Sequence, residues 1–360
     1  MSNPDVLVAG AGAIGALTAL ELAGAGLKVT VIDQGRAARE SSWAGGGILS
    51  PLYPWRYSDA VTALAEWGKP RFQSATEGLA AETGVDPQWH AGGMLVRDVD
   101  DAAQARAWAE RWSVSLSVPE PGAHGVEGLG PSQGADIWMP DIAQLRTPRF
   151  GKALRAALQG RNIELLENTR LDAIRTDAGR VTGACVNGRD LSVGSVVLAT
   201  GAWTGALGAE FGLDLNVYPV KGQMLLFKAH PELLDAVVLG ADRYLIPRRD
   251  GRILIGSTLE HEGFEKQTTA SAADELRAVA VSMLPALADY PVEHHWAGLR
   301  PGKDTPEPWI GPVPGMDGLW VNAGHFRNGM VLSLGSAHLL RQLFLGETPH
   351  CDPTPYRPGA

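Results

Sequence analysis

The 360-residue sequence predicts an α/β fold of two domains, one built on a parallel β-sheet and one rich in antiparallel strands. The chain opens with an apolar strand at residues 5–9, a glycine-rich turn, a helical stretch and a second strand at 29–33. Residues 195–201 begin as a strand that is apolar on both faces, as expected in a buried parallel sheet. Further along, Asp250-Gly251 between two strand-like runs is a hairpin signal, which indicates antiparallel pairing.

The glycine-rich turn has the spacing of a Rossmann dinucleotide-binding motif. Gly10 permits the tight turn, Gly12 lets a pyrophosphate approach the backbone, and Gly15 lets helix and strand pack closely. Free N–H groups at the helix N-terminus would bind the phosphate, and Asp33 at the end of the second strand would accept a bond from a ribose hydroxyl. A lone glycine triplet could be a plain turn, but both strands and the acid in register favour a dinucleotide site.

Composition narrows the class of protein. The chain is 45% hydrophobic and 20% charged, with a net charge of −9 and no basic run longer than Arg248-Arg249, which argues against nucleic-acid binding. Cys185 and Cys351 have no metal-ligand or redox spacing, and the pair His294-His295 is rejected as a metal site because neighbouring strand residues point to opposite faces. No signal peptide or membrane-spanning stretch is recognised, so a cytoplasmic location is expected.

Hydrophobic periodicity predicts the elements that follow the opening unit. Helices are expected at residues 59–83, 100–113, 149–159 and 271–284, with a last helix ending near residue 345. Strands are expected at residues 163–166, 180–187, 195–201, 220–227, 244–247, 252–256 and 319–323, with another ending at 96–98. Residues 117–148 are rich in glycine and proline and are expected to be irregular.

Parallel βα signals at both ends of the chain, with hairpins between them, predict discontinuous domains. We expect a cofactor-binding domain made of residues 1–82, 148–216 and 292–360. Residues 83–147 and 217–291 would form the substrate domain. The length supports two domains, because it exceeds what a single core usually sustains.

Several residues could carry chemistry. Residues 323–330 form a strand-to-helix turn whose free N–H groups could stabilise a reduced flavin ring, although an ordinary junction is the alternative. Arg300 at a strand end and Arg327 in the turn could clamp a carboxylate, or could be solvated surface charges. Tyr244 could present its hydroxyl to a ligand or simply pack in a sheet.

Small residues at 41–48 could admit a bulky planar ligand. Trp43 and Trp203 lie beside suspected cofactor segments, whereas most of the 11 tryptophans are expected to fill the core and the domain boundary.

Eight segments, in this order, resemble the D-amino-acid oxidase superfamily of FAD-dependent amine oxidases, and within it the bacterial glycine oxidases. They are residues 10–15 with Asp33, 41–48, 90–94, 199–203, 219–223, 244–248, 296–302 and 324–329. The resemblance extends over nearly the whole chain, and the last two segments are the most specific. It implies a Rossmann-like FAD-binding domain and an antiparallel-sheet-rich substrate domain, as in the D-amino-acid oxidase (glutathione-reductase-2) type of fold.

The resemblance also implies which residues bind the ligands. The implied FAD-binding set is Gly10, Gly12, Ala13, Ile14, Gly15, Asp33, Gln34, Ser41, Ser42, Gly46, Gly47, Ile48, Leu171, Thr200, Gly201, Trp203, Arg300, His325, Arg327, Asn328, Gly329 and Met330. Arg300 would also bind the substrate carboxylate, Tyr244 would hydrogen-bond it, and Arg327 would line the same pocket.

The implied reaction is oxidative deamination of glycine and small amines, with hydride transfer from the substrate Cα to flavin N5 and release of hydrogen peroxide. The imine, dehydroglycine, would supply thiazole formation in thiamine biosynthesis. Sarcosine, D-amino acids, N-substituted glycines and a quinone-linked dehydrogenase remain alternatives. An NAD-dependent enzyme or a nucleotide-binding module is disfavoured, because it would need neither the segment at 199–201 nor the turn at 327–329.

The family comparison bears on the cofactor attachment. Sarcosine oxidases of this superfamily attach FAD through a cysteine that follows the segment equivalent to Arg300. Residues 303–315 contain no cysteine, so we expect noncovalent FAD. Members of the family also suggest a homotetramer.

Overall fold

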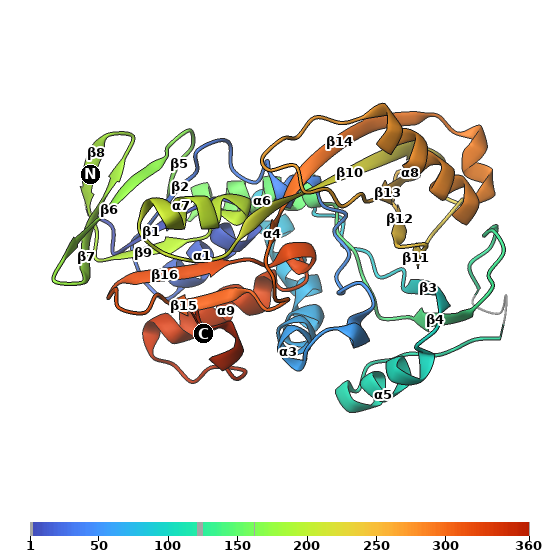
Figure 1. The fold of residues 1–360 in the computed structure, drawn as a ribbon, viewed down its shortest axis with the longest axis horizontal. Coiled ribbons are helices and arrows are strands. Elements are labelled where there is room, and N and C mark those ends of the chain that lie inside the picture. The colour runs from blue at the N-terminus through green and yellow to red at the C-terminus, as the bar shows by residue number, and fades with distance from the viewer. Residues whose placement is uncertain (1–2, 121–124, 162, 360) are drawn as a thin grey trace.

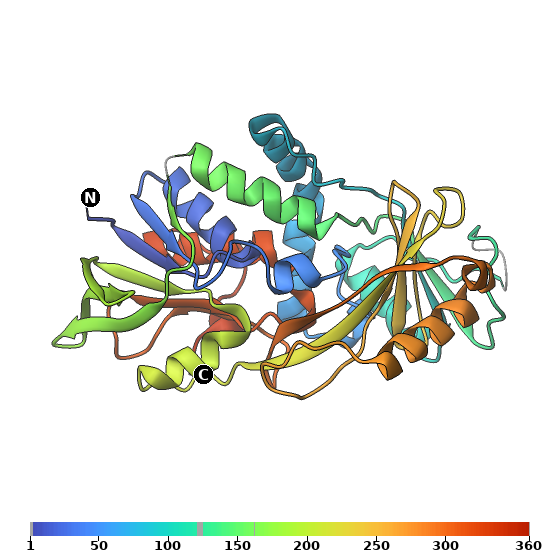
Figure 2. The ribbon, with the colours of Figure 1, turned by 90° about the horizontal axis from the view of Figure 1, so that it is seen from above.

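The computed structural model describes residues 3–120, 125–161 and 163–359, and two large sheets dominate it. A mainly parallel sheet and its helices lie at one end, and a second, mainly antiparallel sheet lies at the other (Figure 1). The view from above shows that the long strands of the second sheet reach from that end to the middle of the molecule (Figure 2).

The six-stranded sheet has the order β15-β16-β9-β1-β2-β5. Its strands are β1 (Val6–Ala9), β2 (Val29–Ile32), β5 (Glu164–Leu166), β9 (Ser195–Leu198), β15 (Trp309–Pro312) and β16 (Leu319–Ala323). All neighbours are parallel except the edge strand β15. β1 and β9 are buried almost completely because helices or strands cover both faces, which explains their continuous apolar sequences.

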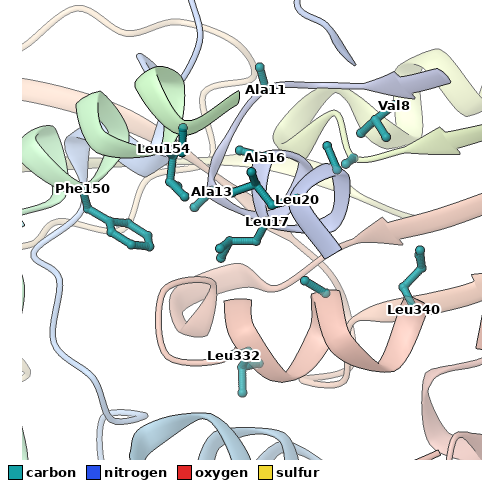
Figure 3. Packing of buried hydrophobic residues seen from close by; sticks show 14 of the residues in the cluster. Val8, Ala11, Ala13, Ala16, Leu17, Leu20, Phe150, Leu154, Leu332 and Leu340 are labelled. Carbon is teal, nitrogen blue, oxygen red and sulfur yellow. The ribbon is translucent and has the colours of Figure 1, made fainter. Parts of the chain in front are cut away.

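Helices α1 (Ala13–Gly24), α6 (Thr147–Gly160) and α9 (Ser333–Leu345) pack beside this sheet. Figure 3 shows α1 with Leu17 and Leu20 between α6, which carries Phe150 and Leu154, and α9, which carries Leu340. Because α1 is in contact with both other helices, it is apolar around most of its circumference. The same core also includes residues of α3 (Asp59–Gly68) and α4 (Phe72–Thr83).

The seven-stranded sheet has the order β14-β10-β13-β12-β11-β3-β4. Its strands are β3 (Met94–Val99), β4 (Ala135–Met139), β10 (Tyr218–Lys228), β11 (Val237–Gly240), β12 (Arg243–Pro247), β13 (Arg252–Gly256) and β14 (Val292–Gly302). The predicted hairpin at Asp250-Gly251 is present, since β12 and β13 pair antiparallel. Helix α8 (Ala270–Met283) packs against β10 and β13.

A small third sheet holds β6 (Leu171–Asp177), β7 (Arg180–Val186) and β8 (Arg189–Ser192). The remaining helices are α2 (Ser41–Ala44), α5 (Ala102–Trp112) and α7 (Thr204–Glu210). Six 3₁₀ turns complete the described elements: η1 (Pro54–Arg56), η2 (Lys69–Arg71), η3 (Gly201–Trp203), η4 (Pro285–Asp289), η5 (Phe326–Asn328) and η6 (Thr354–Tyr356).

The structure departs from the sequence predictions at several elements. The helix expected at 59–83 is interrupted by η2, because Pro70 has no backbone N–H to donate to a carbonyl of the previous turn. The irregular segment expected at 117–148 contains β4 and the start of α6. The small-residue segment 41–48 includes the one-turn helix α2. Five short or half-exposed strands were not predicted: β4, β6, β8, β11 and β15.

The division into domains stays a prediction, and the strand pairing refines one boundary. Residues 292–302 form β14, which pairs along its length with β10 in the seven-stranded sheet. On this pairing, the last segment of the cofactor-binding domain would start after Gly302 rather than at residue 292. Within the described residues, no helix is both long enough and apolar enough to cross a membrane.

Candidate active site

A cavity of about 620 Å³ lies where the two large sheets meet. On one side it is lined by the segments that follow β1, β2, β9 and β16, at the carboxyl ends of four parallel strands. Ligands of open α/β sheets bind at this edge. On the other side, residues of β10, β12 and β14 complete the wall.

The cavity brings together most of the predicted site residues from distant parts of the chain. Those that line it are Gly10, Gly12, Ala13, Ile14, Asp33, Gln34, Ser41, Ser42, Gly46, Gly47, Ile48, Leu171, Thr200, Gly201, Trp203, Tyr244, Arg300, His325, Arg327, Gly329 and Met330. Gly15, Asn328 and Trp43 do not line it.

The glycine-rich turn is shaped by close backbone contacts. Gly10 has φ +103°, and a Cβ there would lie 2.3 Å from the Ala199 carbonyl oxygen. A Cβ on Gly15 would lie 1.9 Å from the Gly10 carbonyl oxygen, so Gly15 is needed for packing rather than for direct contact with a ligand. At Gly12 a Cβ would approach Ser42 Oγ to 3.2 Å and narrow the cavity wall.

Asp33 folds back onto this turn. Its two carboxylate oxygens accept the backbone N–H groups of Ala11 at 2.8 Å and Gly35 at 2.9 Å. Burial raises the pKa of the Asp33 carboxyl, while these two hydrogen bonds act in the opposite direction. Each oxygen still has a lone pair, so the carboxylate can accept a ribose hydroxyl from the cavity.

The two serines of α2 have structural partners. Ser42 Oγ accepts the backbone N–H of Ala13 at 2.8 Å, which satisfies a free donor in the first turn of α1. Ser41 Oγ donates to the Leu299 carbonyl at 2.7 Å and so ties α2 to β14. Both side chains line the cavity while they hold its two walls together.

Arg248 is a buried residue beside the cavity that was not predicted as a site residue, although it ends the segment 244–248 that resembles the family. Its guanidinium donates to the Gly46 carbonyl at 2.7 Å, the Leu145 carbonyl at 3.1 Å and Gln144 Oε1 at 2.8 Å. Burial lowers the pKa of Arg248 to about 9. Because its partners include the carbonyl of Gly46, Arg248 fixes the small-residue segment in the cavity wall.

Arg300 lies in the cavity wall formed by the seven-stranded sheet and has only neutral hydrogen-bond partners among the described residues. Its guanidinium donates to the Lys221 carbonyl at 3.2 Å and to Ser257 Oγ. It lies against Gly222, where a Cβ would come within 2.2 Å of two guanidinium nitrogens. Burial lowers the pKa of Arg300, and no carboxylate among the described residues forms an ion pair with it. The cavity therefore contains a half-buried cation that has no counter-ion among the described residues.

Tyr244 is next to this cation. Its hydroxyl lies 3.2 Å from Ser257 Oγ, the atom that also accepts a hydrogen bond from Arg300. Ser257 lines the cavity and was not predicted from the sequence. A lone serine after a strand carries no pattern that would distinguish it from a turn residue.

The turn at 323–330 differs from the expectation of a helix N-terminus. It contains η5, whereas α9 begins only at Ser333. Arg327 is exposed at the cavity wall and has no charged partner among the described residues. His325 is buried and bonded to Ser336 Oγ at 2.9 Å, and burial lowers its pKa to about 3, so the ring is neutral. The buried Oδ1 of Asn328 has no hydrogen-bond partner.

Aromatic contacts flank the cavity. Trp203 lines it and stacks on Phe264 with ring centroids 5.5 Å apart. Trp43 instead packs edge-on against Trp296 at 6.0 Å, and the Trp296 indole donates to the Ala44 carbonyl at 3.1 Å. Trp43 thus packs against Trp296 of β14 and does not line the cavity.

Comparison with known proteins identifies the group to which this architecture corresponds. Residues 5–343 match the family described as FAD dependent oxidoreductase, DAO. The chain belongs to this family. It is 50% identical to a glycine oxidase of Pseudomonas aeruginosa over 98% of both chains. It is also 50% identical to a glycine oxidase of Pseudomonas putida, over 99% of this chain and 98% of the relative.

Two further comparisons extend the result. A bifunctional protein ThiO/ThiG of Synechocystis is 31% identical over 96% of this chain, which spans 52% of that longer protein. The crystal structure of glycine oxidase from Geobacillus kaustophilus superimposes with a TM-score of 0.93 at 27% identity, with 98% of both chains covered. The predicted D-amino-acid oxidase type of fold is thereby confirmed.

The residues present fit the FAD on which this family depends. The backbone at Gly10 and Gly12 leaves room that side chains would fill, next to the N-terminus of α1, where an anion is stabilised. Arg36 and Arg39 also line the cavity and could supply positive charge for an anionic cofactor, whereas Arg170, which lines it too, is paired with Glu210 at 2.6 Å. Neither cysteine lines the cavity, which agrees with the expectation of noncovalent FAD.

Proposed function

We propose that the protein is an FAD-dependent oxidase of glycine and other small amines. The reaction is glycine + O₂ + H₂O → glyoxylate + NH₃ + H₂O₂. The observation that carries the proposal is Arg300, a half-buried cation that has no counter-ion among the described residues and lies in the wall of a cavity that fits FAD. The relatives with 50% identity that are named glycine oxidase support the choice of substrate.

Arg300 is assigned to bind the substrate carboxylate. Two of the five N–H groups of a guanidinium are used by Lys221 and Ser257, so enough donors remain for a bidentate carboxylate. Binding an anion would supply the missing counter-charge of a desolvated arginine, which favours substrates that carry a carboxylate.

Tyr244 is assigned to hydrogen-bond the same carboxylate, and Arg327 to line the pocket from the opposite wall. Because Arg327 is exposed, solvent screens its charge. We therefore expect Arg327 to attract the substrate carboxylate less strongly than Arg300 does. When bound, FAD supplies the two-electron oxidation of the substrate Cα–N bond and the transfer of those electrons to oxygen.

The chain's own contribution to the chemistry is orientation. A carboxylate fixed by Arg300 and Tyr244 leaves only limited rotation for the two-carbon substrate, so its Cα is held at one place in the cavity. His325 is not assigned as a base, because its neutral ring is buried and bonded to Ser336.

Oxygen as the electron acceptor and noncovalent attachment of FAD are part of the proposal. The bifunctional ThiO/ThiG relatives support a supply of dehydroglycine to thiazole synthesis in thiamine biosynthesis. The cytoplasmic location and the homotetramer stay predictions from the sequence.

The test is an aerobic peroxide assay on the purified yellow protein with glycine, sarcosine and D-alanine side by side. We expect peroxide from glycine at an efficiency equal to or better than that from the other two. Reduction of the flavin without peroxide would replace the oxidase by a dehydrogenase, and no response to glycine would refute the proposed substrate. Release of FAD by denaturation with acid would establish noncovalent attachment.

A further inference from the structure

Ser257 occupies the point between the two residues assigned to the substrate carboxylate. It follows β13 directly, is half-buried and lines the cavity. Its Oγ accepts a hydrogen bond from Nη2 of Arg300 and lies 3.2 Å from the hydroxyl of Tyr244. No other described side chain bonds to both residues.

The hydrogen-bonding capacity of these groups limits how they can be arranged. A serine hydroxyl has one proton and two lone pairs, and a guanidinium can only donate. Arg300 therefore occupies one lone pair of Ser257. Tyr244 donates to the second lone pair, so the serine proton has no partner in this trio. The hydroxyl proton of Ser257 therefore remains available to an anion in the cavity.

The position of Ser257 is fixed by the polar side chains behind it. The neighbouring hydroxyl of Thr258 accepts the backbone N–H of Gln223 at 2.8 Å and donates to Glu260. Glu260 forms an ion pair with the buried Lys221 at 2.9 Å. The carbonyl of that same lysine accepts a hydrogen bond from Arg300, so one network holds both Arg300 and the segment that carries Ser257.

We propose that Ser257 and Tyr244 act as one donor unit for the substrate carboxylate, with Ser257 also holding the guanidinium of Arg300 in its binding orientation. The carboxylate would then meet the arginine N–H groups and one hydroxyl proton of the pair. This inference rests on the proposed function for the identity of the substrate. Its basis is the geometry of a site for any small monocarboxylate, so it can be tested with a ligand that is not oxidised.

The direct test is titration of the holoenzyme with acetate, followed through the absorbance of the bound flavin. The S257A variant is expected to bind acetate on the order of tenfold more weakly, the loss typical of a hydrogen bond to a charged group. Y244F is expected to weaken binding by a similar factor. Because the two hydroxyls act as a unit, the S257A/Y244F variant should lose much less than the product of the two single losses.

Two further variants separate this role from general damage. S257T retains the hydroxyl and should bind acetate within about threefold of the parent. S282A, which removes an exposed hydroxyl of α8 that donates to the Val279 carbonyl, is the matched control and should not differ from the parent. In glycine turnover, S257A should raise KM more than it lowers kcat.

Three results would overturn the inference: parental acetate affinity in S257A, losses that multiply in the double variant, or an S257T variant as weak as S257A. If S257A cannot be isolated with FAD, S257T and Y244F still test the inference. An acetate affinity unchanged by Y244F would also exclude the donor pair. A parent protein that binds acetate through Ser257 but leaves glycine unoxidised would refute the proposed function and not this inference.

Discussion

Replacing Arg300 by alanine removes the half-buried positive charge that lines the cavity and leaves its two neutral partners, the Lys221 carbonyl and Ser257 Oγ, in place. In the wild-type protein a bound carboxylate would gain two charge-assisted hydrogen bonds from the guanidinium. Such bonds contribute about 1.5–3 kcal/mol each, so their loss would cost about 3–6 kcal/mol of transition-state binding. Water entering the space recovers part of this, and we expect kcat/KM for glycine to fall by about a hundredfold to ten-thousandfold.

The assay is oxygen consumption at glycine concentrations well below and well above KM, on protein whose FAD content has been measured. Arg327→Ala is the matched control, because it removes a guanidinium from the same cavity at an exposed position. An exposed charge contributes about 0–1 kcal/mol, so this control should lose less than about tenfold. An R300A variant that stays within tenfold of the parent would refute the assignment. Equal losses in both variants would show that burial does not set the strength of the carboxylate site.

Other parts of the cavity support further predictions. Arg248→Met should leave the carbonyl of Gly46 without its donor, so FAD should dissociate about tenfold more readily and Tm should fall, as measured by fluorescence of the released flavin and by calorimetry. Gly15→Ala should yield protein without FAD, because the new Cβ would lie 1.9 Å from the Gly10 carbonyl oxygen; an A260-to-A450 ratio that matches the parent would contradict this. Burial lowers the pKa of His325 from 6.5 to about 3, so the unfolded state binds more protons between these values. The resulting stability is present above pH 6.5 and is lost as pH falls toward 3; urea unfolding at pH 7 and pH 5 should show a smaller decrease in H325N than in the parent.

The opening unit shows how far local sequence patterns determine structure. Gly15 and Asp33 could be placed from spacing alone, because their contacts with Gly10 and Ala11 lie within about thirty residues of chain. The hairpin at Asp250-Gly251 was predictable for the same reason. Pro70 was an equally local signal, but the helical pattern on both sides outweighed it in the prediction of one continuous helix.

Other features depend on partners that are distant in the sequence. β4 was not predicted, since its pairing with β3 involves residues about forty positions earlier, and its own sequence has few strand formers. Arg248 and Ser257 were missed because a buried arginine and a turn serine look like surface residues until Gly46 or Arg300 is brought beside them. The predicted domain boundary at residue 292 falls at the start of β14 for the same reason, because only the pairing with the distant strand β10 reveals to which sheet β14 belongs.

The placement of Arg300 relative to the FAD side of the cavity follows from contacts between the two large sheets. The parallel strand ends hold the glycine-rich turn, whereas β14 carries Arg300. The segment between Ser41 and Gly46 connects them, since Ser41 donates to the Leu299 carbonyl beside Arg300 and Arg248 donates to the Gly46 carbonyl, each at 2.7 Å.

Between these two hydrogen bonds, the backbones of α2 and β14 pack closely against each other. A Cβ on Gly298 would lie 2.4 Å from the Cβ of Ala44, so the absence of a side chain at position 298 lets β14 pack this closely against α2, and the hydrogen bond from Ser41 to Leu299 holds it there. In a reaction that depends on orientation, a displacement of about 1 Å between the carboxylate site and the cofactor would reduce the rate strongly. The small residues at positions 44 and 298 are therefore as important for the proposed catalytic geometry as Arg300, the arginine assigned to the substrate carboxylate.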